Sequence, residues 1–308
     1  MLDTIILGNG VAGMSAALYA KRANLNFKII GEEAFSVGQI ENAILVENYP
    51  GVKAIDGYSL GNSIREQLED LGVEIEDKKV SEIKRVQSVI EPLDDHYEIN
   101  YTNGETDYSK TVIYALGAKH RPLEDICKVG NEIGYHHCAI CDGTLYKDKS
   151  VAIIGGGNSA FTEALYLSNI AKRVMIITDK VVADNIVQRQ VFETENIDFF
   201  NDSKIESISK LENDIVISFN HHELKYNLGF DGLFVAIGTE PQSQYCPQGV
   251  AKTKFGYVCA DETGYTGLDG FYVAGDVRYK TLRQAITAAA DGVNCANSVV
   301  NYLRKIKE

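Results

Sequence analysis

A glycine fingerprint typical of dinucleotide-binding turns occurs twice in this chain of 308 residues. The two copies are Gly8-x-Gly10-x-x-Gly13 and Gly155-x-Gly157-x-x-Ala160. In such a turn one glycine makes the tight bend, a second lets the backbone approach a pyrophosphate, and a third residue lets helix pack on strand. The helix N-terminus then offers N–H groups and a positive dipole end to phosphate. We therefore expect two dinucleotide-binding turns in one chain.

The segments around the two fingerprints repeat as two βαβ units. The expected strand, helix and strand are 4–7, 12–23 and 27–30 in the first unit, and 151–154, 159–169 and 174–177 in the second. The remaining pattern gives a loop at 36–51, a helix at 58–71, strand-like alternation over 73–114 and 191–229, a strand at 271–274 and a helix at 282–300.

Two strand-like runs, 111–115 and 233–237, each lead into a glycine and read as crossings between domains. This predicts an α/β fold of two doubly wound Rossmann-like domains, the second inserted into the first. The predicted boundaries are 1–116 with 240–308 for the first domain and 117–239 for the inserted one.

The chain is acidic, with a formal net charge of −13 at pH 7. This disfavours binding to the phosphates of nucleic acids and to anionic membrane surfaces. No apolar run reaches the roughly 18 residues that a membrane-spanning helix needs. The first residues also lack the basic region of a secretory signal. We therefore expect a cytoplasmic protein that binds neither nucleic acid nor membrane.

A vicinal dithiol, Cys138-Ala-Ile-Cys141, lies between the two fingerprints and is followed directly by Asp142. Cysteines at the start of a helix have a lowered thiolate pKa, because helix N–H groups stabilise the negative sulfur. His136 and His137 could add positive charge, and Asp142 could shuttle the proton that thiol–disulfide exchange requires. We therefore interpret Cys138 and Cys141 as a redox pair. The cysteines expected to be inert, partly buried side chains are Cys127, Cys246, Cys259 and Cys295.

Zinc is the alternative ligand of the dithiol segment, because two histidines and two cysteines could supply four ligands. Adjacent histidines rarely reach one ion together, and the chain has no second Cys-x-x-Cys. Redox chemistry is therefore favoured, and no metal site is predicted.

Acidic residues follow the second strand of each βαβ unit. Glu32 and Glu33 could hold a ribose hydroxyl, or could be solvated surface. In the second unit Asp179 can bond ribose hydroxyls but would repel a 2′-phosphate, and no arginine pair is present to bind that phosphate. If a nicotinamide binds there, NADH is favoured over NADPH; the alternative is a relic of the fold that binds no nicotinamide.

In combination these motifs resemble those of the low-molecular-weight thioredoxin reductase family of flavoproteins, over nearly the whole chain. The motifs that carry the resemblance are Gly8-Asn-Gly-Val-Ala-Gly13, Gly38-Gln39-Ile40, Glu47-Asn48-Tyr49-Pro50-Gly51, Cys138-Ala-Ile-Cys141-Asp142-Gly143, Gly155-Gly-Gly-Asn-Ser-Ala160, Ala274-Gly275-Asp276-Val277 and Arg283-Gln284-Ala285.

The resemblance implies that FAD occupies the first fingerprint. The further residues expected at FAD are Gln39 and Asn48 near the flavin, Asp276 on its ribitol chain, Arg283, Gln284 and Ala285 along its ring, and Gly117 and Gly275. Cys138 and Cys141 match the redox pair of the family, and Asp142 matches its acid–base residue. The family is homodimeric, and its inserted domain rotates so that the dithiol alternates between flavin and protein substrate.

One stretch departs from the family's pattern. Members that use NADPH carry His-Arg-Arg, with a further arginine, after the second strand of the inserted domain. Here the matching stretch is Thr178-Asp179-Lys180, with Asp184 near the further arginine. The resemblance thus predicts an FAD-dependent reductase of thioredoxin or a similar redoxin, with NADH, ferredoxin or another donor in place of NADPH. The alternatives are a dithiol oxidase that uses oxygen and a nonenzymatic flavin-binding redox sensor.

Overall fold

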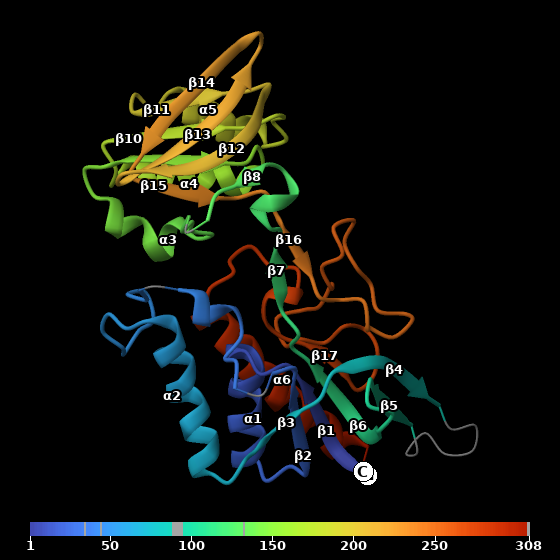
Figure 1. The fold of residues 1–308 in the computed structure, drawn as a ribbon. Coiled ribbons are helices and arrows are strands. Elements are labelled where there is room, and N and C mark those ends of the chain that lie inside the picture. The colour runs from blue at the N-terminus through green and yellow to red at the C-terminus, as the bar shows by residue number, and fades with distance from the viewer. Residues whose placement is uncertain (34, 44, 88–94, 132, 307–308) are drawn as a thin grey trace. The chain divides into compact units, whose positions relative to one another are not determined.

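The computed structural model describes residues 1–33, 35–43, 45–87, 95–131 and 133–306, and it divides into two compact units. The first unit is Met1–Lys119 with Glu240–Glu308, and the second is His120–Thr239. In Figure 1 the blue and red ends of the chain share the first unit, whereas the second unit is green and yellow. The predicted fold class, with one Rossmann-like domain inserted into another, is confirmed. Part of the predicted strand-like region 73–114, residues 88–94, lies outside the described residues.

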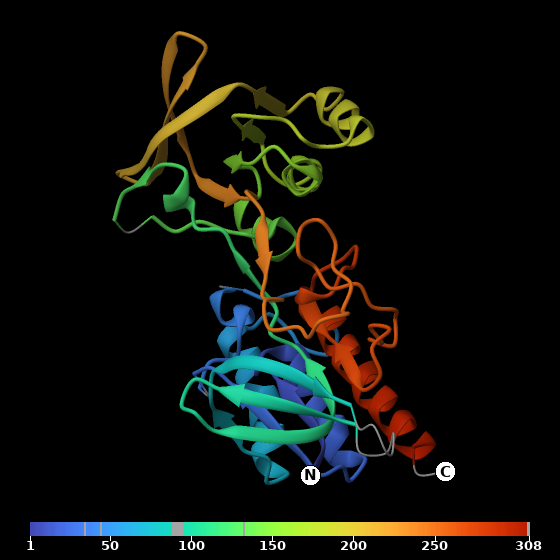
Figure 2. The same cartoon turned by 90° about the vertical axis from the view of Figure 1, so that its right-hand side faces the viewer.

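The first unit is built on a mixed sheet with the strand order β3-β2-β1-β6-β5-β4, and β17 also pairs with β6. Its strands are β1 (Leu2–Leu7), β2 (Phe27–Gly31), β3 (Ile75–Asp77), β4 (Val80–Val86), β5 (His96–Tyr101), β6 (Thr106–Tyr114) and β17 (Phe271–Val273). Strands β1, β2, β3, β6 and β17 pair in parallel, and β4 and β5 form an antiparallel extension with β6, seen in Figure 2.

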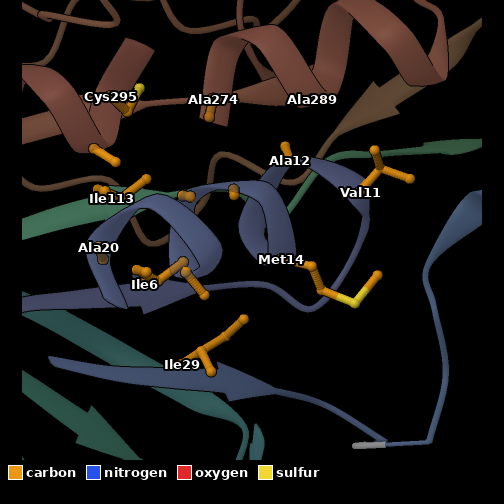
Figure 3. Close-up of a cluster of buried hydrophobic side chains, with 14 of the residues drawn as sticks. Ile6, Val11, Ala12, Met14, Ala20, Ile29, Ile113, Ala274, Ala289 and Cys295 are labelled. Atoms are coloured by element: carbon orange, nitrogen blue, oxygen red, sulfur yellow. The ribbon is translucent and has the colours of Figure 1, made fainter. Parts of the chain in front are cut away.

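The centre of this sheet is apolar because its parallel strands are buried on both faces. Helix α1 (Val11–Arg22) packs on it, and α6 (Ala285–Lys305) packs on α1. Figure 3 shows small α1 side chains such as Ala12 between the strands and α6. A Cβ added at Gly292 of α6 would lie 2.1 Å from the carbonyl oxygen of Ala12. The two helices therefore touch through their backbones. Helix α2 (Gly57–Asp70) completes this layer.

The second unit contains two sheets, with the strand orders β11-β10-β9-β15 and β14-β13-β12-β8. Their strands are β8 (Lys128–Val129), β9 (Ser150–Ile154), β10 (Arg173–Ile177), β11 (Ile197–Phe200), β12 (Ser203–Leu211), β13 (Asp214–His221), β14 (Leu224–Phe230) and β15 (Gly232–Val235). The helices are α3 (Ala139–Asp142), α4 (Asn158–Ser168) and α5 (Asn185–Phe192). The first sheet is parallel, and its two faces pack on α4 and on the second sheet.

The chain crosses between the units through two short paired strands, β7 (Ala118–His120) and β16 (Thr239–Pro241). Three predicted segments differ from the structure. The strand-like region at 191–229 begins too early, because Val191 and Phe192 end helix α5. The last helix is Ala285–Lys305, not 282–300, because Gln284 caps it through a capping box with Thr287. The expected loop at 36–51 contains the 3-10 helix η1 (Gln39–Asn42). No helix in the described ranges is long and apolar enough to cross a membrane.

Candidate active site

The first fingerprint forms the turn between β1 and α1, and its glycines occupy two kinds of surroundings. A Cβ at Gly8, whose φ is 112°, would lie 2.3 Å from the carbonyl oxygen of Ala115. A Cβ at Gly13 would lie 1.8 Å from the carbonyl oxygen of Gly8. At Gly10 the nearest atom would be 3.9 Å away. Two positions are therefore close-packed, and the third leaves open space at the start of α1.

The structure distinguishes between the two acids that follow β2. Asn9 of the fingerprint donates to the carbonyl oxygens of Glu33 (3.1 Å) and Ser36 (2.8 Å), which ties this loop to the turn. Glu32 pairs with the ammonium of Lys79 at 2.6 Å. Within the described ranges the Glu33 carboxylate has no ion pair or side-chain hydrogen bond. Glu33 is therefore the acid available to a ribose hydroxyl.

Residues distant in sequence meet near the start of α6. Asn48 Nδ2 donates to Gln284 Oε1 at 3.0 Å, and Gln284 is the N-cap that precedes Ala285. The Arg283 guanidinium stacks on the Tyr257 ring at 4.1 Å, and its Nε lies 3.4 Å from the carbonyl oxygen of Asp276. The structure thus brings together three of the residues expected along the flavin ring with Asn48 and Asp276.

Asp276 lies in the 3-10 helix η5 (Gly275–Val277) and has an unusual carboxylate. Its Oδ1 atom is buried and has no hydrogen-bond partner in the described part of the chain, although Lys280 Nζ lies 3.4 Å away. Behind it, Asp291 accepts from the backbone N–H of Gly275 at 3.1 Å and pairs with Arg278 at 2.8 Å. The backbone of η5 is therefore fixed, and one carboxylate oxygen remains available.

Gly38, from the motif that contains Gln39, and Gly117, which is expected at the cofactor, have positive φ. Gly38 (φ 79°) precedes Gln39, and a Cβ there would lie 2.8 Å from Gly10 Cα. The start of η1 is thus held against the fingerprint. Gly117 (φ 70°) has no atom within 4 Å of such a Cβ. The open turn, the available carboxylates and these close approaches together fit a flavin dinucleotide.

The dithiol is present as a Cys138–Cys141 disulfide. Cys138 is the N-cap of α3, and its sulfur accepts a hydrogen bond from the backbone N–H of Cys141 at 3.2 Å. Both cysteines are partly exposed, and Ile140 between them is 41% exposed. The disulfide therefore lies at the surface of its unit, where another molecule can reach it.

Asp142 and His136 form a buried pair beside this disulfide. Asp142 Oδ2 lies 3.0 Å from His136 Nδ1, and both side chains are 8% exposed. His137 faces other groups: its Nδ1 lies 3.0 Å from the Val235 carbonyl oxygen, and its ring stacks on His120. The two adjacent histidines therefore have different partners.

The remaining cysteines are not paired. Cys127, Cys246 and Cys259 are partly buried and Cys295 is fully buried. Burial raises the pKa of Cys127 and of Cys246 to about 11 each, and it raises the pKa of Cys295 further. These three thiols are therefore poor nucleophiles at neutral pH.

The second fingerprint repeats the geometry of the first. At Gly155 (φ 145°) a Cβ would lie 2.4 Å from the Ala236 carbonyl oxygen, and at Gly157 the nearest atom would be 3.9 Å away. Asp179 beyond β10 is exposed. Asp184 is held beside α4, because its Oδ2 accepts from Asn158 Nδ2 at 2.6 Å. The carboxylates of Asp179 and Asp184 therefore both lie in the segment that follows β10.

One further candidate, Glu163 of α4, was missed by sequence reasoning. Its Oε2 is buried without a hydrogen-bond partner among the described residues, and burial raises the pKa of its carboxyl to about 8. Phe161, Ala164 and Leu167 nearby on α4 are fully buried. The available signal was a lone acid among apolar residues of the helix that begins at the second fingerprint.

We expect Glu163→Gln to stabilise the protein at alkaline pH. The folded-state pKa of about 8 exceeds the ordinary value of 4.5, so the folded state binds this proton more tightly than the unfolded state. The free energy of unfolding therefore falls as the pH rises from about 4.5 through about 8. Glutamine stays neutral, so the variant's thermal midpoint should exceed the parent's by a few degrees above about pH 8. The two midpoints should converge near pH 4.5; a constant difference at every pH would contradict this assignment.

Comparison with known proteins places this geometry in a family. The family model of pyridine nucleotide-disulphide oxidoreductases matches residues 2–292. A thioredoxin reductase of Mycoplasma genitalium is 37% identical over 307 residues, which cover 96% of this chain and 94% of that protein. A 34.2 kDa protein in the rubredoxin operon of Clostridium pasteurianum is 35% identical over 309 residues, 98% of this chain and 97% of that protein. The crystal structure of thioredoxin reductase from Streptococcus pyogenes has a TM-score of 0.86 at 32% identity, covering 99% of each chain. The chain belongs to the pyridine nucleotide-disulphide oxidoreductase family and is an FAD-dependent disulfide oxidoreductase of the low-molecular-weight thioredoxin reductase type.

Proposed function

We propose that this protein reduces the disulfide of thioredoxin or a similar small redoxin through its Cys138–Cys141 pair. The observation that carries the proposal is this disulfide, exposed on its unit with the buried carboxylate of Asp142 next to it in sequence. The names of the relatives support the choice of substrate. The proposal includes a cytoplasmic homodimer, as the resemblance implies.

The residues of the first unit would hold FAD in defined roles. The fingerprint around Gly10 would receive the pyrophosphate, Glu33 a ribose hydroxyl, and Asp276 the ribitol chain. Asn48 and Gln284, already bonded to each other, would lie with Arg283 along the ring. When bound, the flavin supplies a two-electron carrier between a donor and the disulfide. The protein's own residues would position it.

The two cysteines would have different roles in the exchange. The backbone N–H of Cys141 points at the Cys138 sulfur, so a thiolate at Cys138 is stabilised by that hydrogen bond. Cys138 would attack one sulfur of the partner's disulfide, which forms a mixed disulfide and releases the partner's other sulfur as a thiolate. Cys141 would then attack the Cys138 sulfur, so that the Cys138–Cys141 bond forms and the partner sulfur bound to Cys138 leaves as a thiol. Asp142 would exchange the proton at the sulfurs.

The electron donor is proposed to be NADH, ferredoxin or another donor, and not NADPH. The support is electrostatic. Asp179 and Asp184 follow β10, where a 2′-phosphate would need arginine cations, and Asp184 is held in place by Asn158. Each carboxylate near a phosphate raises the energy of the complex.

An anaerobic titration of the purified holoprotein tests the donor. We expect NADPH at micromolar concentration to leave the flavin absorbance unchanged, and NADH or reduced ferredoxin to bleach it. Rapid bleaching by NADPH would refute the donor assignment. If the reduced protein failed to pass electrons to a thioredoxin disulfide, the proposal that thioredoxin is the substrate would be refuted. Rapid reoxidation by air with a small dithiol would favour the dithiol oxidase.

A further inference from the structure

His136, a residue that the proposed exchange does not use, lies at the centre of a chain of three side chains. Its Nδ1 is 3.0 Å from Asp142 Oδ2, and its Nε2 is 2.7 Å from the Tyr146 hydroxyl. Its backbone is fixed by β15, because its N–H donates to the Leu233 carbonyl oxygen at 2.9 Å. His136 thus links the carboxylate next to the dithiol with a tyrosine on η4 (Gly143–Tyr146).

Hydrogen-bond chemistry allows a single pattern when Asp142 is ionised and the His136 imidazole is neutral. A carboxylate accepts only, so His136 must donate from Nδ1. A neutral imidazole then accepts at Nε2, and the Tyr146 hydroxyl must be the donor there. Burial, followed by the charges of Asp142 and Asp231, raises the pKa of Tyr146, so its hydroxyl keeps the proton that this pattern needs. Each of the two hydrogen bonds of His136 then joins a donor to an acceptor.

The chain has one buried end and one end that reaches solvent. Asp142 is 6% exposed, and its second oxygen, Oδ1, is buried without a hydrogen-bond partner in the described ranges. Tyr146 is partly exposed, with the ammonium of Lys149 5.7 Å from its ring centre. The Tyr146 ring is fixed, because it covers Gly232, where a Cβ would lie 2.2 Å from the ring. The geometry is that of a relay between a buried carboxylate and water.

We propose that His136 and Tyr146 form a proton relay that connects Asp142 with solvent during thiol–disulfide exchange at Cys138 and Cys141. This inference rests on the proposed function, and it assigns the two residues as positioning residues that act through Asp142. Sequence reasoning considered His136 as a source of positive charge. The structure instead gives it two hydrogen-bonded partners, of which Tyr146 is partly exposed.

The relay balances over one redox cycle. When the disulfide accepts two electrons, the Cys138–Cys141 bond breaks; one sulfur stays a thiolate and the other takes a proton. The ionised Asp142 receives that proton from His136 Nδ1 and passes it to the sulfur, while Nε2 takes the Tyr146 proton and water restores the hydroxyl. When the pair is reoxidised by another disulfide, a thiol proton returns through Asp142 to Nδ1, and the proton on Nε2 leaves through Tyr146. One proton enters and one leaves, and the imidazole returns to its first tautomer.

Stopped-flow oxidation of the reduced holoprotein by an aromatic disulfide, 5,5′-dithiobis(2-nitrobenzoate), tests the relay. In this reaction two electrons leave the pair, the Cys138–Cys141 bond forms and two aromatic thiolates depart. Tyr146→Phe removes one oxygen and keeps the ring over Gly232, so the fold should persist. We expect its rate at pH 7 to fall by about tenfold, which is less than the range of about 10²–10⁴ for removing a general acid or base itself. We also expect this rate, unlike the parent's, to rise with imidazole concentration.

Tyr135→Phe is the matched control, because Tyr135 is also partly exposed but packs on His137 outside the relay. The Tyr135→Phe protein should react at the parent's rate, and that rate should not depend on the imidazole concentration. His136→Gln should show the same buffer dependence as Tyr146→Phe. Parental rates and parental buffer dependence in both relay variants would overturn the relay and leave the proposed function intact. A parent protein whose pair does not exchange at all would overturn both. Groups that also face the relay, Asp231, Lys149 and His137, stay unchanged in every variant.

Discussion

Cys141→Ser is expected to stop turnover with thioredoxin and to leave the partner covalently attached to Cys138. Cys138 keeps the backbone N–H of residue 141 as a donor, because serine preserves that amide, so its attack on the partner's disulfide is retained. The mixed disulfide then has no resolving thiol. Turnover should fall by at least about 10³-fold. A reducible conjugate of this protein and thioredoxin should appear on a nonreducing gel.

The reciprocal variant and a control make this outcome specific. Cys138→Ser should lose turnover to the same extent but should form no conjugate, because the attacking sulfur is gone. Cys127→Ser should behave like the parent, since burial keeps the Cys127 thiol protonated at neutral pH. If Cys141→Ser retained turnover, the two-cysteine mechanism would be wrong. If the conjugate formed through Cys141 instead, the order of the two sulfurs would be reversed.

The elements around the fingerprints were predictable because local pattern and tertiary packing agree there. The apolar run of β1 is buried on both faces, and the alanines of α1 are small because α6 touches its backbone. Helix α5 was missed because it is short and only Val191 on it is fully buried, so its spacing carries a weak signal. Local residue types were therefore sufficient to predict the helices and strands where a ligand or a close approach of two backbones constrains those residues.

Other features of the site depend on contacts between distant residues. Lys79 pairs with Glu32, which lies 47 residues earlier in the sequence, and this ion pair leaves Glu33 available. The His136–Asp142 pair requires β15 to fix the backbone of His136. Neither contact has a signature in a single sequence, since a histidine next to a cysteine is compatible with metal binding, packing or proton transfer. Spacing could therefore identify the two sulfurs of the disulfide and the neighbouring Asp142, but not the side chains that contact Asp142.

Gly13→Ala is expected to lower the stability of the fold, whereas Gly10→Ala is expected to weaken the binding of FAD, although both remove a fingerprint glycine. At Gly13 the new methyl group would lie 1.8 Å from the backbone oxygen of Gly8, which cannot move without shifting β1. Overpacking of this kind costs about 1–3 kcal/mol or more, so the thermal midpoint should fall by roughly 2–5 °C or more with or without flavin. Calorimetry of flavin-free and flavin-loaded protein would measure both effects.

At Gly10 the added methyl group meets nothing closer than 3.9 Å, and the backbone φ of −74° is ordinary for alanine. Flavin-free Gly10→Ala should therefore unfold within a degree or two of the flavin-free parent, since no contact is lost. The methyl group instead occupies the space through which a pyrophosphate would approach the start of α1, so the Kd for FAD should rise by at least about tenfold. A Gly10→Ala protein that binds FAD as tightly as the parent would show that the open face of this turn is not the phosphate site. Gly13→Ala, by contrast, should lose stability through a packing clash alone. The two variants therefore separate a glycine that the fold requires, Gly13, from a glycine that the ligand requires, Gly10.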